Sequence, residues 1–248
     1  MEKVVKELNE KFIKIKNNDL NKSLREGYTG LGYTFESLIG KSEDRMYFPD
    51  YKGIEIKTKL GYSKSPLTLF CMSPQKNGNT CAEELLKKYG YPKKNYKKLK
   101  SFGGSAYQNE RNIIANKYFF KTKLDFKNKK LKIIIVDINL RVLEDSIYWD
   151  LNEIKDRLYT KLKILALVNG YPYKRNGDVY YKYTNIKFYK LKGFYVFLKL
   201  LKEDKVFITF NIGTFTDARR YGIIHDRGTA FRIKIDSIEE LFVPINVK

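Results

Sequence analysis

A short segment near residue 50 places two acidic residues and a lysine where they could act together. In "FPDYKGIEIKTK", residues 48–59, Asp50 precedes Glu55 and Lys57 across a glycine-containing turn. The alternation in "IEIKTK" predicts a strand, and residues two apart in a strand point to the same face. Two neighbouring carboxylates favour a cation between them, and oxygen ligands suit Mg²⁺, which also accepts water and phosphate oxygens. Because a lysine beside the metal could orient the attacking water, these residues have the parts for phosphodiester hydrolysis.

The spacing by itself is a weak signal, because similar spacings arise often in a lysine-rich chain. A solvated strand face with a Glu–Lys ion pair would have the same residues at the same spacing. The flanking Ile54 and Ile56 favour a strand that packs on its other side,. Both interpretations therefore stay open at this point.

The charge balance indicates a polyanionic partner. The chain has 248 residues, with 49 Lys and Arg against 28 Asp and Glu, a formal net charge of +21. A proteome rich in Lys, Asn and Tyr could supply part of this surplus, although acidic residues would be equally available to it. Aromatic residues interleave with lysine, as in "YPYKRNGDVYYKYTNIKFYKLKGF", and this mixture suits nucleic acid. The alternative is a basic soluble protein with no such partner.

Several classes of protein are disfavoured by composition. No run of about 18 apolar residues occurs, so no membrane span is expected, and the N-terminus lacks the apolar centre of a signal peptide. Cys71, Cys81 and the single histidine, His225, are too few for a disulfide framework or a zinc site,. A reducing, cytoplasmic location is the expectation.

The first part of the chain alternates helices and strands. Apolar spacing predicts a helix over residues 2–16, and a second helix should follow with Thr34 as its N-cap. Strands are expected over 54–59 and 66–72, and a short helix over 82–89.

The middle of the chain contains a basic, glycine-containing segment near 90–117, which we expect to be an excursion rather than core. Residues 118–142 predict two paired strands, the second nearly all apolar and therefore central. Asp150 should cap a helix that ends near residue 162, and a buried strand is expected over 163–170.

After Gly170 the chain changes to short aromatic strands and turns. The predicted fold class is α/β: a mixed central sheet flanked by helices, with an added β-rich lobe. The expected ranges are 1–170 for the first lobe and 171–248 for the second, with a soft boundary.

Four segments together resemble the MvaI/BcnI type of restriction endonuclease. They are "GYTGLGYTFESLIG", "FPDYKGIEIKTK", "SPLTLFCMSP" and "HDRGTAFRI", and they follow the family's order and similar spacing over nearly the whole chain. The resemblance extends to MutH, a repair nickase with a glutamate upstream of its own Asp…Glu-x-Lys motif.

This resemblance implies a PD-(D/E)xK nuclease, in which a catalytic lobe and a DNA-recognition lobe clamp double-stranded DNA between them. It implies Mg²⁺ as cofactor and a monomer that nicks one strand of a short, near-palindromic site, then rebinds to cut the other. Asp50, Glu55 and Lys57 become the catalytic set, with the first two as metal ligands. Glu36 matches the upstream acid that helps to organise the metal site, although a solvated helix charge is the ordinary explanation of such a residue.

The resemblance also implies residues that contact DNA. Arg232, at the end of "HDRGTAFRI", matches an arginine that contacts guanine, for which a bidentate hydrogen bond is the physical reason. His225 matches a histidine near the DNA, but "HDRG" could equally be a tight turn. Arg219 and Arg220, in the hairpin before this segment, could hold phosphates or lie in a solvated loop. The full set of residues expected to contact DNA is Thr209, Asn211, Arg219, Arg220, His225, Arg227 and Arg232.

One strand departs from the family pattern. Where enzymes that read CC…GG sites carry an Asp and an Arg, this chain has Thr209 and Asn211. Asparagine pairs best with adenine, so we hypothesise an adenine in the site, as in a GATC-like target.

Three functions remain open from the sequence. The first is a type II restriction endonuclease, for which a cognate DNA methyltransferase would be the partner in the same system. The second is a MutH-like nickase that depends on partner proteins, and the third is a catalytically inactive DNA-binding module.

Overall fold

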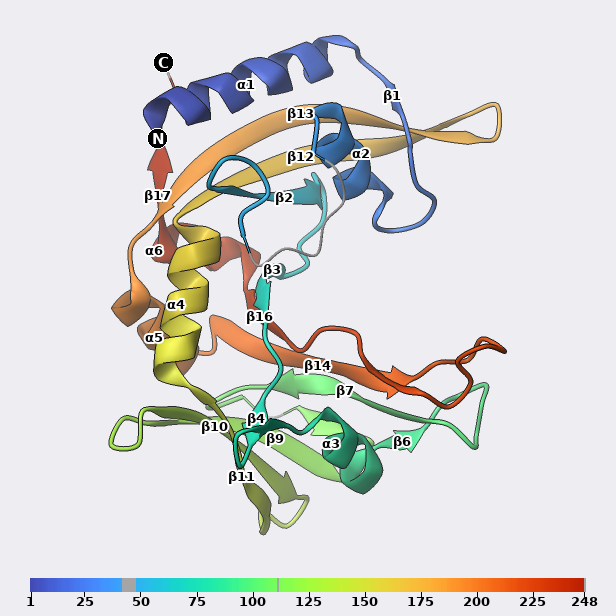
Figure 1. Cartoon of the computed structure of the whole chain (residues 1–248), viewed down its shortest axis with the longest axis vertical. Coiled ribbons are helices and arrows are strands. Elements are labelled where there is room, and N and C mark those ends of the chain that lie inside the picture. The colour runs from blue at the N-terminus through green and yellow to red at the C-terminus, as the bar shows by residue number, and fades with distance from the viewer. Residues whose placement is uncertain (42–47, 111, 248) are drawn as a thin grey trace. The chain divides into compact units, whose positions relative to one another are not determined.

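The computed structural model describes residues 1–41, 48–110 and 112–247 (Figure 1). The chain forms two compact units, each assembled from separate stretches. The first unit comprises residues 1–65, 157–193 and 238–248, and the second comprises 66–156 and 194–237. The expected boundary at residue 170 is wrong, because that residue lies inside strand β12 (Ile164–Arg175), which pairs with one neighbouring strand on both sides of a register shift between Asn169 and Gly170.

A mixed sheet forms the centre of the first unit. Its strands lie in the order β1 (Asn21–Lys22), β13 (Asp178–Leu191), β12 and β2 (Ile54–Leu60), and β17 (Phe242–Ile245) also pairs with β13. Strands β2 and β12 are parallel, whereas β12 and β13 form a long antiparallel hairpin. The predicted strand over 54–59 is confirmed. After Gly170 the chain first continues this long hairpin, and the expected short strands follow only later in the chain.

Helices α1 (Glu2–Asn17) and α2 (Gly30–Leu38) belong to the same unit and share its core with the sheet (Figure 1). The buried residues of α1 recur at three- and four-residue intervals: Val5, Leu8, Phe12 and Ile15. This spacing places them on one helix face, so α1 covers the sheet as the sequence predicts. Helix α6 (Ile238–Leu241) also belongs to this unit.

Helix α2 begins earlier than expected. Its N-cap is Thr29 rather than Thr34, which lies inside the helix and is fully buried. The Thr34 hydroxyl accepts a hydrogen bond from the Leu24 backbone N–H at 3.0 Å. The Thr34 hydroxyl therefore hydrogen-bonds to the preceding loop and does not cap the start of the helix.

Two six-stranded sheets make up most of the second unit. One has the order β5 (Asn79–Thr80), β4 (Gln75–Lys76), β11 (Val142–Asp150), β10 (Lys130–Asp137), β9 (Tyr118–Asp125) and β8 (Ile113–Ile114). The other has the order β3 (Leu67–Cys71), β16 (Ala230–Ile233), β14 (Val206–Thr214), β7 (Lys100–Ala106) and β6 (Tyr91–Pro92), with β15 (Ile224–Asp226) also paired to β14. Because it carries most of the residues that the sequence predicts to contact DNA, we call it the recognition sheet. The sheets pack through aromatic side chains such as Phe102, Phe120, Trp149 and Phe210.

Two expectations for this unit are wrong. The segment near 90–117 is not an excursion, because β7 is an interior strand of the recognition sheet and its Phe102 and Ala106 are fully buried. Helix α5 (Phe194–Lys202) lies in a region expected to hold only strands and turns. Its apolar residues pack inward at helical spacing, which the many aromatic residues nearby had obscured.

The remaining helices agree with the sequence. Helix α3 (Ala82–Tyr89) has the expected bounds, and α4 (Leu151–Leu162) is capped by Asp150, whose Oδ1 accepts the Asn152 N–H at 2.7 Å. A short 3₁₀ turn, Ile235–Ser237, follows β16. No helix in the described part of the chain is long and apolar enough to cross a membrane.

Candidate active site and nucleic-acid face

Strand β2 carries the candidate catalytic residues on one edge of the first unit's sheet. Ile54 and Ile56 are buried in the core shared with α1 and α2. Glu55 and Lys57 alternate with them, and pair in register with Leu165 and Leu167 of β12. The alternation therefore directs the two charged side chains away from the α1–α2 core, as the sequence predicts.

A tight turn brings Asp50 back to this strand. Tyr51 and Ile54 exchange backbone hydrogen bonds at 2.9 and 2.8 Å around Lys52 and Gly53, which have φ values of 45° and 89°. Positive φ at both central positions is the geometry of a two-residue hairpin turn that favours glycine. As a result, the Asp50 Oδ2 accepts the Ile56 backbone N–H at 2.9 Å.

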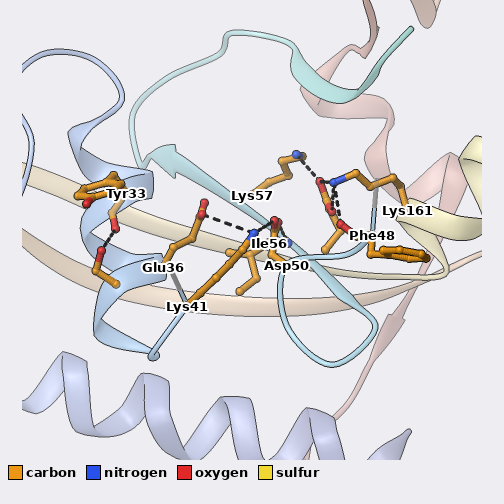
Figure 2. A network of polar contacts seen from close by, with 10 residues as sticks. Tyr33, Glu36, Lys41, Phe48, Asp50, Ile56, Lys57 and Lys161 are labelled. Carbon is orange, nitrogen blue, oxygen red and sulfur yellow. Dashed lines mark hydrogen bonds and ion pairs between the residues drawn. The ribbon is translucent and has the colours of Figure 1, made fainter. Parts of the chain in front are cut away.

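Three lysines pair with the acidic residues of the site (Figure 2). Lys57 Nζ lies 2.6 Å from Glu55 Oε1, and Lys161 Nζ lies 3.4 and 3.0 Å from the two oxygens of the same carboxylate. Lys41 Nζ donates a short hydrogen bond to Asp50 and lies 3.9 Å from Glu36. The structure thus brings all four predicted residues into one network.

Burial makes the charges of this network depend on one another. The side chain of Glu55 is only 2% exposed, so its ionised form needs cationic partners. Burial, followed by the nearby negative charge of Asp50, raises the pKa of Glu36, while Lys41 opposes the shift. These are the effects expected where several carboxylates face a common space.

The donor set suits a Mg²⁺ ion that keeps much of its water. Among the residues that the structure describes, no three His, Cys, Asp or Glu side chains are close enough to hold a metal by themselves. Mg²⁺ is commonly bound through one or two carboxylates, with water and substrate phosphate completing its coordination. Asp50 and Glu55 supply two carboxylates of this kind, each of which pairs with a lysine ammonium in the structure.

Two residues of this site, Lys41 and Lys161, are not predicted by the sequence patterns. Lys161 lies 106 positions after Glu55, and also donates to the Phe48 carbonyl at 3.1 Å. It occupies the last turn of α4, where a lysine is commonplace because it opposes the helix dipole. No local pattern distinguishes it from the chain's many other lysines.

The recognition sheet of the second unit gathers most of the predicted DNA-contacting residues on one face. In β14, Ile208, Phe210 and Ile212 are buried, whereas Thr209 and Asn211 are directed to the other face and Asn211 is exposed.

Register extends this face across the neighbouring strands. Arg232 pairs with Phe207, and His225 pairs with Gly213, so both share the face of Thr209 and Asn211,. Among the described residues, the Nε of Arg232 is buried with no hydrogen-bond partner.

The surrounding turns hold the other predicted residues in different ways. The "HDRG" segment does form a tight turn, since Asp226 Oδ1 accepts the Gly228 and Thr229 N–H groups, each at 3.0 Å. His225 nevertheless keeps its place on the sheet face, where its ring stacks on Phe215 at 4.6 Å.

The three predicted arginines that lie outside the strands, Arg219, Arg220 and Arg227, are not equivalent. Arg220 is held within its own hairpin, with its guanidinium 3.8 Å from the Phe215 ring centroid and 3.0 Å from Asp217. Arg219 and Arg227 are exposed, and the backbone N–H of Arg227 donates to the Asn211 carbonyl at 2.9 Å. Arg227 is therefore fixed next to the recognition face, whereas Arg220 is engaged locally.

A mixed sheet that presents Asp50, Glu55 and Lys57 beside a helix carrying Glu36 defines a PD-(D/E)xK-type nuclease fold. A sequence model of the MvaI/BcnI restriction endonuclease family matches residues 9–242. The chain belongs to this family.

Solved structures agree with this assignment. The chain is similar to a restriction endonuclease MvaI–cognate DNA substrate complex, with 26% identity, a TM-score of 0.87, and coverage of 97% of this chain and 98% of that one. It is also similar to restriction endonuclease MvaI in the absence of DNA, with 26% identity, a TM-score of 0.63, and coverage of 100% and 99%. No curated protein matched the chain by sequence.

Proposed function

We propose that this restriction endonuclease is a type II enzyme that uses Mg²⁺ to hydrolyse phosphodiester bonds of double-stranded DNA at a short, near-palindromic site. The observation that carries the proposal is the network on β2, where Asp50, Glu55 and Lys57 meet Glu36 and two further lysines. The likeness to a DNA complex of MvaI supports DNA as the substrate.

The catalytic roles follow from the geometry of these residues. Bound Mg²⁺ would supply positive charge to the scissile phosphate and lower the pKa of a bound water. Asp50 and Glu55 would hold the ion through their carboxylate oxygens. Lys57, two residues along the same strand, would orient the attacking water through its Nζ and stabilise negative charge on the phosphate. Glu36 would organise the metal site from α2.

Site recognition is assigned to the exposed face of the recognition sheet. Asn211 would accept a hydrogen bond from the N6 amino group of adenine and donate one to N7. Arg232 would donate two hydrogen bonds to guanine. The pairing of Arg232 with Phe207 places Arg232 on the face of Asn211, which supports this role,. Thr209 and His225 adjoin these residues, while Arg219 and Arg227 would contact phosphates.

The proposed mode of cleavage follows from the presence of one candidate active site in each chain. We propose a monomer that nicks one strand and then rebinds to cut the other, and a cognate methyltransferase that protects the host site. Mapping the ends of cleaved plasmids of known sequence tests the adenine hypothesis, and cuts confined to CC…GG sites would contradict it.

The principal experiment separates binding from cleavage. Asp50→Ala and Glu55→Ala should lose Mg²⁺-dependent plasmid cleavage yet retain binding to the site duplex in Ca²⁺, because the recognition residues lie on other strands. Glu10→Ala, which removes an exposed carboxylate from α1, is the matched control and should cut normally.

The outcome distinguishes the three candidate functions. Double-strand breaks made by the purified protein alone support the restriction enzyme, whereas nicking that requires an added protein indicates a MutH-like enzyme. Binding without any Mg²⁺-dependent cleavage by the wild type indicates an inactive binding module, and cleavage retained by Asp50→Ala refutes the site assignment.

A further inference from the structure

Lys93 lies across the recognition sheet, outside the residues that the sequence or the family assigns to DNA. It directly follows β6, and its backbone N–H donates to the Leu99 carbonyl at 2.9 Å. Its side chain extends to β14, where Nζ donates a short hydrogen bond to the Thr214 carbonyl. A lysine ammonium has three N–H donors, so this contact fixes Lys93 and leaves donors for a ligand.

The Lys93 side chain lies next to Gly213 of β14. A Cβ added to Gly213 would lie 3.7 Å from Lys93 Cε and 3.7 Å from Ser101 Oγ. Lys93 and Ser101 therefore flank the same point on the sheet surface. His225 pairs with Gly213 in register on the neighbouring strand, so this point adjoins the predicted recognition residues.

The charge around Lys93 is positive and uncompensated by an acid. Burial and the neighbouring charge of Arg227 lower the pKa of Lys93. Among the described residues no carboxylate forms an ion pair with either side chain. Positive side chains near one another without an acidic partner favour an anion nearby.

Strand β7 continues the face of Asn211 next to these cations. Ser101, Gly103 and Ser105 of β7 pair in register with Gly213, Asn211 and Thr209, and point to the same face. The Tyr91 hydroxyl also lies there, because it would be 3.3 Å from a Cβ added to Gly103. Hydroxyl groups therefore adjoin Asn211 on this face.

We propose that Lys93, together with Ser101 and Arg227, binds a backbone phosphate of the nucleic acid that Asn211 reads. The inference rests on the proposed function and adds to it a phosphodiester site that positions the DNA without reading its sequence. Lys93 and Arg227 supply charge, and the Ser101 hydroxyl supplies a neutral donor, a combination usual for phosphate contacts.

Salt dependence of DNA binding tests this proposal. Binding of a fluorescent site duplex, and of a scrambled duplex, is measured by anisotropy in Ca²⁺ over a range of KCl concentrations. Loss of one phosphate contact should reduce the slope of log K against log salt by about 0.9, and weaken binding by roughly 8-fold near 0.1 M salt. Lys93→Met should show this change equally on both duplexes.

Two further variants make the result specific. Lys87→Met removes the same charge from an exposed position on α3 and should keep the wild-type slope. Lys93→Arg keeps the charge and should also keep the slope. The proposal is overturned if Lys93→Met behaves like Lys87→Met, or if it alters preference for the site duplex while leaving the slope unchanged.

Inorganic phosphate serves as the second ligand. If Lys93→Met weakens binding of inorganic phosphate by calorimetry but leaves the DNA slope unchanged, the site takes free anions and the proposal fails. Failure of the proposed function gives a different result. If the wild-type protein never cleaves DNA, but its salt slope for DNA binding depends on Lys93, the phosphate site stands without the nuclease activity. A wild type that cleaves specifically with no Lys93 effect loses only this inference.

Discussion

Lys161 should stabilise the fold chiefly through its contact with the buried Glu55 carboxylate. Lys161→Met removes the ammonium while keeping an unbranched apolar stem. The substitution breaks contacts of 3.0 and 3.4 Å to Glu55 and of 3.1 Å to the Phe48 carbonyl. Because Glu55 is 2% exposed and Lys161 16% exposed, solvent can replace little of what is lost.

The expected loss of stability depends on the cation that remains beside Glu55. Removing one partner of a buried ion pair costs about 3–5 kcal/mol when the other charge is left alone. Here Lys57 remains 2.6 Å from Glu55, so the loss should approach that of a charged hydrogen bond, about 1.5–3 kcal/mol. We expect Lys161→Met to lower the free energy of unfolding by about 2 kcal/mol.

Urea denaturation in EDTA, followed by circular dichroism, measures this change. The same measurement on Glu55→Gln and on the double variant completes a double-mutant cycle. Since the two residues are in contact, the effects should be non-additive by about 1–2 kcal/mol. Lys163→Met, an exposed substitution two positions away, is the control and should change stability by less than about 0.5 kcal/mol. Additive effects, or a Lys161→Met variant as stable as the control, would refute the reasoning.

Two pH-dependent predictions concern other, partly buried carboxylates. Burial and Asp50 raise the pKa of Glu36, so folding is favoured below its ordinary value of 4.5 and that advantage is lost as pH rises through the raised pKa. Glu36→Gln should therefore unfold at higher urea than wild type near pH 8 and match it near pH 4, in EDTA; a larger difference at acid pH would contradict this. For Glu144, burial raises the pKa, but hydrogen bonds from Ser146 and Lys76 outweigh it and lower the pKa from 4.5 to about 2. This stabilisation, about 3 kcal/mol, is present above 4.5 and is lost as pH falls toward 2, so Glu144→Gln should be destabilised at neutral pH and converge with wild type in acid; equal urea midpoints at neutral pH would disprove it.

Local patterns were sufficient for much of the catalytic strand. Alternation of Ile54 and Ile56 with charged residues defines β2 and the shared face of Glu55 and Lys57, because side chains in a strand alternate. Glycine in the turn after Asp50 allows the positive φ that returns its carboxylate to the strand,. These features depend on neighbours within about ten residues, so the sequence alone expresses them.

The β-rich half of the chain was harder to predict, because its strands depend on partners that are distant in the sequence. Strand β7 looked like a basic loop because Gly103, Gly104 and the preceding lysines resemble turn sequences. It becomes an interior strand only because β14 supplies hydrogen-bond partners along its length. Helix α5 was hidden among aromatic residues that suit strands as readily as a buried helix.

Local sequence thus determined the strand, the turn and the type of chemistry, through backbone preferences and side-chain periodicity. Only the tertiary structure decided which of many lysines serve the site, since Lys161 meets Glu55 from a different element 106 residues away. The same holds for Lys93, whose Nζ reaches the Thr214 carbonyl of β14 from a position 121 residues earlier in the chain. Lysines are alike in sequence, and packing alone determines which carboxylate, carbonyl or phosphate each one can reach.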